Sequence, residues 1–154
     1  MSFRTLLAVS GFVTTLFGGQ AVAQAGAGDV TFEVPVNLTQ LSANISKVAV
    51  ECAVANHPSY LGQPGLGQSR DVIKGRGELG AAGGQVSGTA RVTISGNWKP
   101  GATIYYECKL VGFNKQNVVW RAFHVKEPSD SPFHVSPTPE PIKGSFEWSL
   151  KEAK

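Results

Sequence analysis

Helix signals are nearly absent from this chain of 154 residues. Its apolar residues instead alternate with polar ones at a period of two, and glycines and prolines separate the alternating runs. Parallel sheets need long crossover connections, which are usually helices, so a parallel α/β fold is excluded. The sequence therefore predicts an all-β, antiparallel sandwich or barrel.

Charge is also sparse. Removing Arg4 with the N-terminal segment described below lowers the Lys and Arg count from 14 to 13, against 11 Asp and Glu, which leaves a net charge of +2. Such a small and evenly spread charge does not favour nucleic acid or an anionic membrane as a partner. No later apolar run is long enough to span a bilayer, so the mature chain is predicted to have no transmembrane segment.

Several catalytic and metal-binding motifs are missing. The sequence has no Gly-x-Ser-x-Gly turn and no histidines spaced His-x-His or His-x-x-x-His. The glycine-rich run over residues 75–84 lacks the lysine and the following helix of a phosphate-binding loop. We interpret residues 80–84 as a flexible hairpin connection between two strands. No residue is nominated as catalytic, and no cofactor is expected.

The beginning of the chain has the three parts of an export signal. Arg4 is positively charged, residues 5–17 form an apolar stretch, and Ala21-Val22-Ala23 supplies the small residues that a signal peptidase requires. Polar residues and glycines interrupt the apolar stretch, which is shorter than the roughly 20 residues of a membrane anchor. We therefore expect cleavage after Ala23.

Cleavage after Ala25 is the alternative, because Ala23-Gln24-Ala25 fits the same small-x-small rule. The predicted organisation is a signal peptide over residues 1–23 followed by a single domain over residues 24–154. The protein is accordingly predicted to be periplasmic or extracellular.

Two cysteines, Cys52 and Cys108, remain in the mature chain. Exported proteins fold in an oxidising compartment, where an even number of thiols normally pairs. A metal-bound thiolate or a redox-active cysteine is the alternative, but neither cysteine lies in a Cys-x-x-Cys motif or beside a histidine. Both cysteines fall on inward faces of predicted strands, so we expect one disulfide that links two packed sheets.

About seven strands are predicted between residues 30 and 150. They are expected at residues 30–38, 47–55, 71–79, 85–95, 103–113, 118–126 and 144–150. Pro35 cannot donate to a β-ladder, which indicates an edge strand or a bulge in the first run. Both parities of residues 118–126 are apolar, which indicates a bulge or a strand covered on both sides. Trp148 is expected in the core.

The inward Cys52, the Tyr106-Glu107-Cys108 triplet and the strand count resemble an immunoglobulin-like β-sandwich. A tyrosine two residues before the second cysteine has the spacing of the tyrosine corner of that fold. Immunoglobulin domains carry a tryptophan roughly a dozen residues after the first cysteine. Here that region is a loop rich in glycine and proline, and Trp98 precedes the second cysteine instead. Because such a fold hosts many functions, the resemblance does not nominate one.

Histidines and aromatic residues are the candidate site residues. A zinc or copper site would need two or three histidines to converge with a carboxylate. The spacing of the three gives this little support, so no metal is predicted and they stay candidates only: His57, His124 and His134. Aromatic residues on loops and outward faces are compatible with a ligand or partner surface, and core packing explains most tryptophans equally well. The candidates for that surface are Tyr60, Trp98, Tyr105 and Trp120.

The leading functional hypothesis is an exported, non-enzymatic module that binds a protein or glycan partner through loops or an exposed strand edge, or has a structural role. The edges best suited to strand addition are expected at residues 30–38 and 144–150. The alternative is a small periplasmic metal-binding protein or hydrolase that uses the three histidines. Convergent histidines in a concavity would favour the alternative, and scattered histidines would favour the binding module.

Overall fold

The computed structural model describes residues 22–25, 28–61, 72–122, 135 and 138–149, and for residues 22–25 and 120–122 it describes the backbone alone. These residues form strands and one short 3₁₀ helix, Pro58–Tyr60. The strands are β1 (Val22–Ala25), β2 (Asp29–Leu38), β3 (Lys47–Ala55), β4 (Val72–Gly80), β5 (Val86–Ser95), β6 (Thr103–Phe113), β7 (Val119–Ala122) and β8 (Ile142–Glu147).

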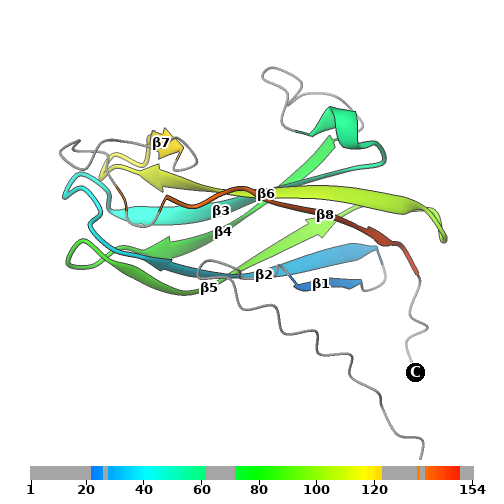
Figure 1. Ribbon diagram of the computed structural model, residues 1–154, viewed down its shortest axis with the longest axis horizontal. Helices are drawn as coiled ribbons and strands as arrows, with labels where there is room; N and C mark the ends of the chain where they lie inside the picture. Colours follow the sequence, from blue (N-terminus) through cyan, green and yellow to red (C-terminus); the bar gives the residue numbers. More distant parts are fainter. Residues whose placement is uncertain (1–21, 26–27, 62–71, 123–134, 136–137, 150–154) are drawn as a thin grey trace, which may run out of the picture.

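The strands form two antiparallel sheets that pack face to face as a sandwich (Figure 1). The smaller sheet has the order β1-β2-β5, and the larger sheet has the order β4-β3-β6 followed by β7 and β8. β7 pairs with residues 111–113 of β6, and β8 pairs with residues 103–108 along the same side of that strand. The prediction of an all-β, antiparallel sandwich is confirmed.

The core lies between the two sheets and follows from the alternation of each strand. In β2 every second side chain is buried, from Val30 through Phe32 to Leu38, and the residues between them face solvent. β3 and β5 contribute Val50 and Val92 from opposite sheets in the same way. A strand with one buried face needs only this period-two pattern to be correctly oriented. Trp148 lies in the core as expected, with 1% of its surface exposed.

The pairing between β6 and the strand that follows it, β7, is irregular. The pairing register of β6 and β7 shifts between Gly112 and Phe113. Val118 and Val119 are 58% and 53% exposed, so both parities of this segment face solvent at its start. The register shift fits the bulge that the sequence indicated as one of two outcomes. The side chains of residues 120–122 and the whole of residues 123–126 lie outside the described part of the chain.

β1 was not expected from the sequence, and it changes the status of β2. Residues 22–25 pair antiparallel with residues 30–33, while the other side of β2 pairs with β5 along its whole length. In the uncleaved chain residues 30–33 are therefore not at the edge of the sheet, whereas the edge strand was expected for the mature chain. Pro35 lies beyond the last residue that β1 covers, which is where a strand tolerates proline.

The expected hairpin at residues 80–84 is wrong. β4 belongs to the larger sheet and β5 to the smaller one, and between them only Ala82 and Gln85 form an isolated bridge. The glycines of this turn carry the chain from one sheet to the other, since Gly83 and Gly84 both have positive φ angles. The glycine-rich run over residues 75–80 is itself part of β4, so it is neither a hairpin loop nor a phosphate loop.

Glycines inside β4 let its backbone approach β5 across the sandwich. A Cβ atom on Gly75 would lie 2.8 Å from Cγ1 of Ile94, and one on Gly77 would overlap the carbonyl oxygen of Arg91. Packed sheets are normally about 10 Å apart because side chains fill the space between them. Where β4 lacks side chains, the two sheets nearly meet and one side of the sandwich is closed.

Candidate functional site

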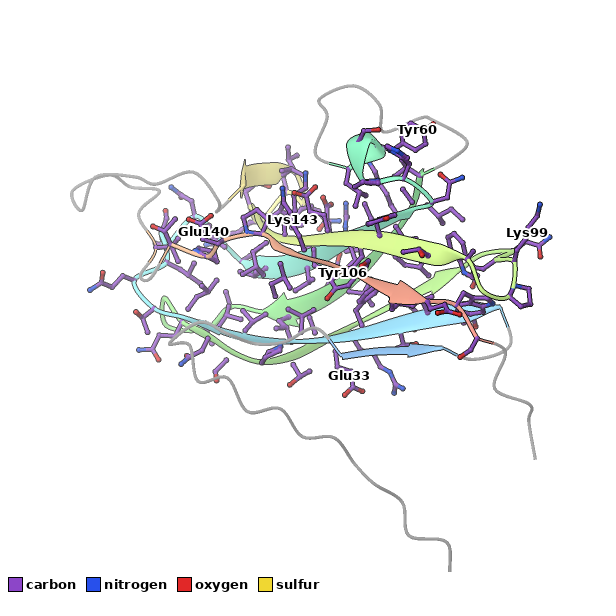
Figure 2. The ribbon with its side chains drawn as sticks, turned by 45° about the vertical axis from the view of Figure 1, so that its right-hand side comes forward. Glu33, Tyr60, Lys99, Tyr106, Glu140 and Lys143 are labelled. Carbon is purple, nitrogen blue, oxygen red and sulfur yellow. A yellow bond between two sulfur atoms is a disulfide. The ribbon has the colours of Figure 1, made fainter. Side chains whose placement is uncertain are left out.

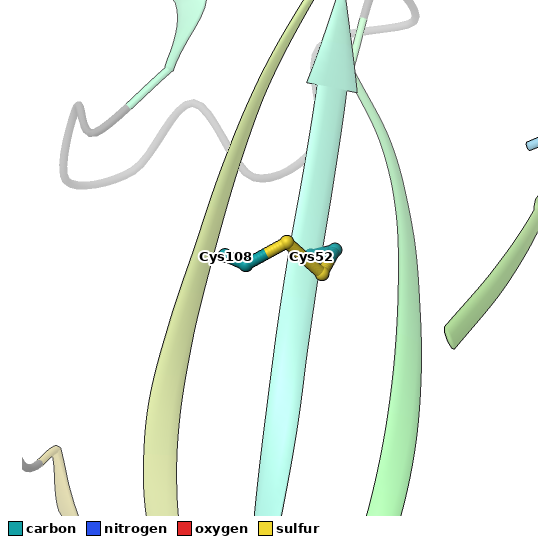
Figure 3. The surroundings of a disulfide bond; sticks show 2 residues. All are labelled: Cys52 and Cys108. Atoms are coloured by element: carbon teal, nitrogen blue, oxygen red, sulfur yellow. A yellow bond between two sulfur atoms is a disulfide. The ribbon is translucent and has the colours of Figure 1, made fainter. Parts of the chain in front are cut away.

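The disulfide between Cys52 and Cys108 is present, but it lies within one sheet (Figure 3). The two residues are direct register partners on the neighbouring strands β3 and β6, with Cα atoms 4.0 Å apart. The expectation of a bond that links two sheets is therefore wrong. Alternation indicates which face a cysteine occupies, and it does not indicate which strand lies beside it. Both sulfur atoms are buried on the core side, where the bond joins the two central strands.

A buried disulfide fits a protein that folds outside the reducing cytoplasm. In the part of the chain that the structure describes, no helix is long and apolar enough to cross a membrane. The same residues contain no group of three or more His, Cys, Asp and Glu side chains that could hold a metal ion.

His57 acts locally, at the start of the short 3₁₀ helix. Its Nδ1 accepts a hydrogen bond from the backbone N–H of Ser59 at 3.3 Å and lies 2.7 Å from the Ser59 hydroxyl. Its ring packs against Tyr60 at 5.6 Å between centroids. These contacts cap a turn, as expected of a loop histidine before proline. His124 and His134 lie outside the described residues.

Two of the four aromatic candidates lie at the same end of the larger sheet. Tyr105 faces outward from β6, opposite Ala55, which is the last residue of β3. Tyr60 follows Ala55 by five residues and is 36% exposed on the 3₁₀ helix (Figure 2). At this end of the sheet, the Tyr60 ring packs beside His57, and Tyr105 occupies an outward position on β6.

The other two aromatic candidates do not join that surface. Trp98 packs against the core, with its ring 6.3 Å from that of Trp148 and directly over Gly96. Trp120 lies in β7, beside residues 111–113 at the far end of β6 from Tyr105. Six residues of extended strand separate these positions by roughly 20 Å. The four residues therefore do not form one continuous platform.

The outer face of the larger sheet carries paired charges. Glu51 and Glu107 occupy outward register positions on the neighbouring strands β3 and β6, which places them diagonally across the ladder. Arg76 donates to Glu51 at 2.6 Å, and Lys143 donates to Glu107 at 3.1 Å. Each carboxylate therefore has its own cation on the next strand, which is the arrangement of a structural charge ladder.

Phe113 is buried on this outer face because long cationic side chains cover it. The Lys47 ammonium lies 5.1 Å and the Arg76 guanidinium 4.9 Å from the centre of its ring. Such contacts contribute about 0.5–1 kcal/mol each at an exposed site. Together with Ala49 and Val111, Phe113 forms a small apolar cluster outside the main core.

Between the sheets, the side opposite the closed one is lined by aromatic rings. Tyr106 of β6 lies 5.0 Å from Phe32 of β2 and 6.3 Å from Phe146 of β8, measured between ring centroids. Its hydroxyl end covers Gly144, since a Cβ there would lie 2.6 Å from the Tyr106 oxygen. Burial raises the pKa of the Tyr106 hydroxyl above its usual value of 10.0. Figure 2 shows Tyr106 in the space between the two layers.

The strand that covers this aromatic side, β8, is an edge strand. It pairs with β6 on one side and with no other strand among the described residues. The Cα spacing of Cys52 and Cys108 is that of a pair whose amides point away from each other, so Cys108 directs its N–H and C=O toward β8. Alternation along β8 then places backbone donors and acceptors at its free edge: those of Lys143, Ser145 and Glu147.

No protein-family model, curated protein or solved structure matches this chain. The geometry described above is therefore the basis for any functional conclusion.

Proposed function

We propose that this protein is an exported, non-enzymatic binding module that holds a protein partner by strand addition along the free edge of β8. The observation that carries the proposal is the row of backbone groups at Lys143, Ser145 and Glu147, which no strand of the described residues pairs with. An extended segment of another protein can add to such an edge through main-chain hydrogen bonds. The scattered local contacts of His57 and the paired carboxylates favour binding over catalysis.

We also propose that the sandwich is immunoglobulin-like, which its strand order supports. If β1, β2 and β5 are the A, B and E strands, then β4, β3, β6 and β8 occupy the places of C′, C, F and G. This correspondence preserves the neighbours A-B-E and C′-C-F-G. The disulfide then joins C to F within a sheet, where immunoglobulin domains join B to F across the sandwich.

Export through a cleaved signal over residues 1–23, to the periplasm or the exterior, is part of the proposal. The sequence pattern and the disulfide support it. Intact mass spectrometry of the protein recovered from the envelope and from the medium is the test. A mass that corresponds to a chain beginning at Gln24 or Gly26, and that is two hydrogens lower than the mass of the reduced chain, supports export. Recovery of the full-length chain would overturn it.

The binding role is tested by changing one backbone donor at the β8 edge. Ser145→Pro removes the outward N–H of an exposed residue and leaves the β6 ladder donors of β8 in place. Ser145→Ala is the matched control, because it removes only the hydroxyl. We expect partner capture from the envelope fraction to be lost in Ser145→Pro and kept in Ser145→Ala. Equal capture by both variants would show that the β8 edge is not used.

A second readout identifies the binding mode. In the complex, the amides of Lys143, Ser145 and Glu147 should exchange with solvent more slowly than in the free protein, because they become ladder donors. Protection confined to the loops would instead indicate loop-mediated recognition.

A further inference from the structure

β1 consists of the same residues that form the expected signal peptidase site. It spans residues 22–25, and the two candidate cleavage positions follow Ala23 and Ala25. Its register places Ala23 and Ala25 opposite Phe32 and Val30, the buried positions of β2. Cleavage therefore removes half or all of the strand that covers this part of β2.

The edge beneath β1 has its backbone groups directed outward. Thr31 and Thr93 are register partners whose hydroxyl oxygens are 3.1 Å apart, the closeness expected of a pair whose amides point away from each other. Thr31 and Glu33 therefore direct their N–H and C=O groups away from β5, toward β1. Pro35 shares this parity, so the nitrogen that lacks a proton does not interrupt the β5 ladder.

Only the first half of this edge is open to pairing after cleavage. Pro35 protects the second half, because it cannot donate to an added strand. A cut after Ala23 leaves two residues of β1, which is too short to hold a ladder at a chain terminus. A cut after Ala25 leaves none. Either product presents Thr31 and Glu33 as unpaired donors beside the buried Phe32.

We propose that this β2 edge joins two copies of the mature protein, antiparallel and around a two-fold axis that passes beside Phe32. The inference rests on the proposed export and cleavage, but not on the proposed use of β8. The site is covered by β1 in the uncleaved chain and opens when β1 is removed. Two-fold symmetry, in which the same surface of each copy meets, is the commonest symmetry of homo-oligomers.

Charge selects the register of this pairing. Centring on Thr31 would place Asp29 opposite Glu33 of the second copy, and centring on Glu33 would place two glutamates directly opposite each other. Centring on Phe32 places Thr31 opposite Glu33 of the second copy and Asp29 opposite its Pro35, so no carboxylates face each other directly. Arg91, 3.9 Å from Glu33, offsets the remaining acidic charge.

The register centred on Phe32 also pairs apolar side chains on the core-facing side of β2. It places Val30 opposite Val34 of the second copy, and both valines are buried on the core side of β2. Paired β-branched side chains stabilise a ladder. Pairing ends at Pro35, where the donor is missing, so the added ladder has a defined length.

The first test is native mass spectrometry of the exported, processed protein, with Glu33→Pro and Glu33→Gln as a matched pair. Both variants remove the charge, but only proline removes the N–H that faces the second copy. We expect dimers in the wild type and in Glu33→Gln, and at least a tenfold lower dimer fraction in Glu33→Pro. A monomeric wild type, or equal dimer fractions in the two variants, would overturn the proposal.

Covalent trapping keeps the test independent of the folding of the proline variant. Thr31→Cys combined with Glu33→Cys places the two new thiols opposite each other across the two-fold axis, at a spacing that a disulfide spans. The double variant should form a covalent dimer, and each single variant should form much less. Equal trapping by the single variants would contradict the register. Recovery of unprocessed protein would instead count against the proposed export.

Discussion

The two sides of the sandwich are built in opposite ways. On the closed side, Gly75 and Gly77 bring the backbone of β4 against β5, with no space for an added atom. On the open side, Phe32, Tyr106 and Phe146 fill the space between β2 and β8. Among the described residues β8 has an edge that another chain can reach, whereas β1 covers residues 30–33 of β2. We therefore expect added atoms on the closed side, and removed atoms on the open side, to lower the free energy of unfolding.

The contrast concerns how the edges of the two sheets are protected on each side of the sandwich. β4 and β5 protect each other by close approach, which leaves no unpaired edge wide enough for a third strand. β2 and β8 are kept apart by aromatic side chains, which leaves the edge of β8 available and, after the proposed removal of β1, that of β2 as well. The proposed binding sites both lie on the side where the core is made of rings instead of glycines.

The largest effect is expected from Phe32→Ala on the open side. Phe32 is fully buried and contacts both aromatic neighbours, so its loss should lower the free energy of unfolding by about 4 kcal/mol. Phe146→Ala is the comparison, and its half-buried ring should cost clearly less. Urea denaturation measures both. Equal losses would mean that Phe32 is not the centre of this cluster.

On the closed side, Gly77→Ala should lower the free energy of unfolding by about 2–3 kcal/mol. The added Cβ would overlap the Arg91 carbonyl, which belongs to a backbone that cannot move without disturbing β5. Gly80→Ala is the matched control in the same strand, because nothing lies within 4 Å of its added Cβ. Thermal unfolding of the two variants measures the difference in stability. If Gly77→Ala is as stable as Gly80→Ala, the two sides of the sandwich do not differ in this way.

A pH-dependent effect is expected on the open side. Because burial raises the pKa of Tyr106 in the folded protein above 10.0, folding favours the neutral hydroxyl. This contribution is fully present below pH 10 and is lost as the pH rises through the raised value. Tyr106→Phe should show a smaller decline in stability between pH 8 and about 11 than the wild type. Tyr105→Phe serves as the control, and an identical change there would rule out a specific role for Tyr106.

The smallest effect is expected on the outer face, near the closed side. Glu51→Gln breaks the ion pair with Arg76, whose side chain is 45% exposed. Solvent screens such a pair, so the loss should be below about 1 kcal/mol and should shrink further in high salt. Chemical denaturation at low and high ionic strength measures it. A loss as large as that of Gly77→Ala would show that the charge ladder, and not close packing, holds β4 in place.

Most strands could be located from the sequence, because burial of one face makes apolar and polar residues alternate along a strand. The bounds of β3 and β6 match the expected residues 47–55 and 103–113, and the Cys52–Cys108 bond forms as expected. β1 was missed because the predicted cleavage after Ala23 divides it between the export signal and the start of the mature chain. Of the candidate site residues, Tyr60 and Tyr105 lie at the same end of the larger sheet, whereas Trp98 packs against the core, which no local pattern distinguishes from a surface loop.

The sequence by itself determined most of the strands and their inward faces, because alternation with buried valines and cysteines is a local property. Only the tertiary structure decided which strands are neighbours. It placed Cys52 beside Cys108 within one sheet, put β4 and β5 in different sheets, and laid residues 22–25 on the edge of β2. Pairing depends on contacts between residues far apart in the chain, and side-chain periodicity specifies a face without specifying the strand beside it.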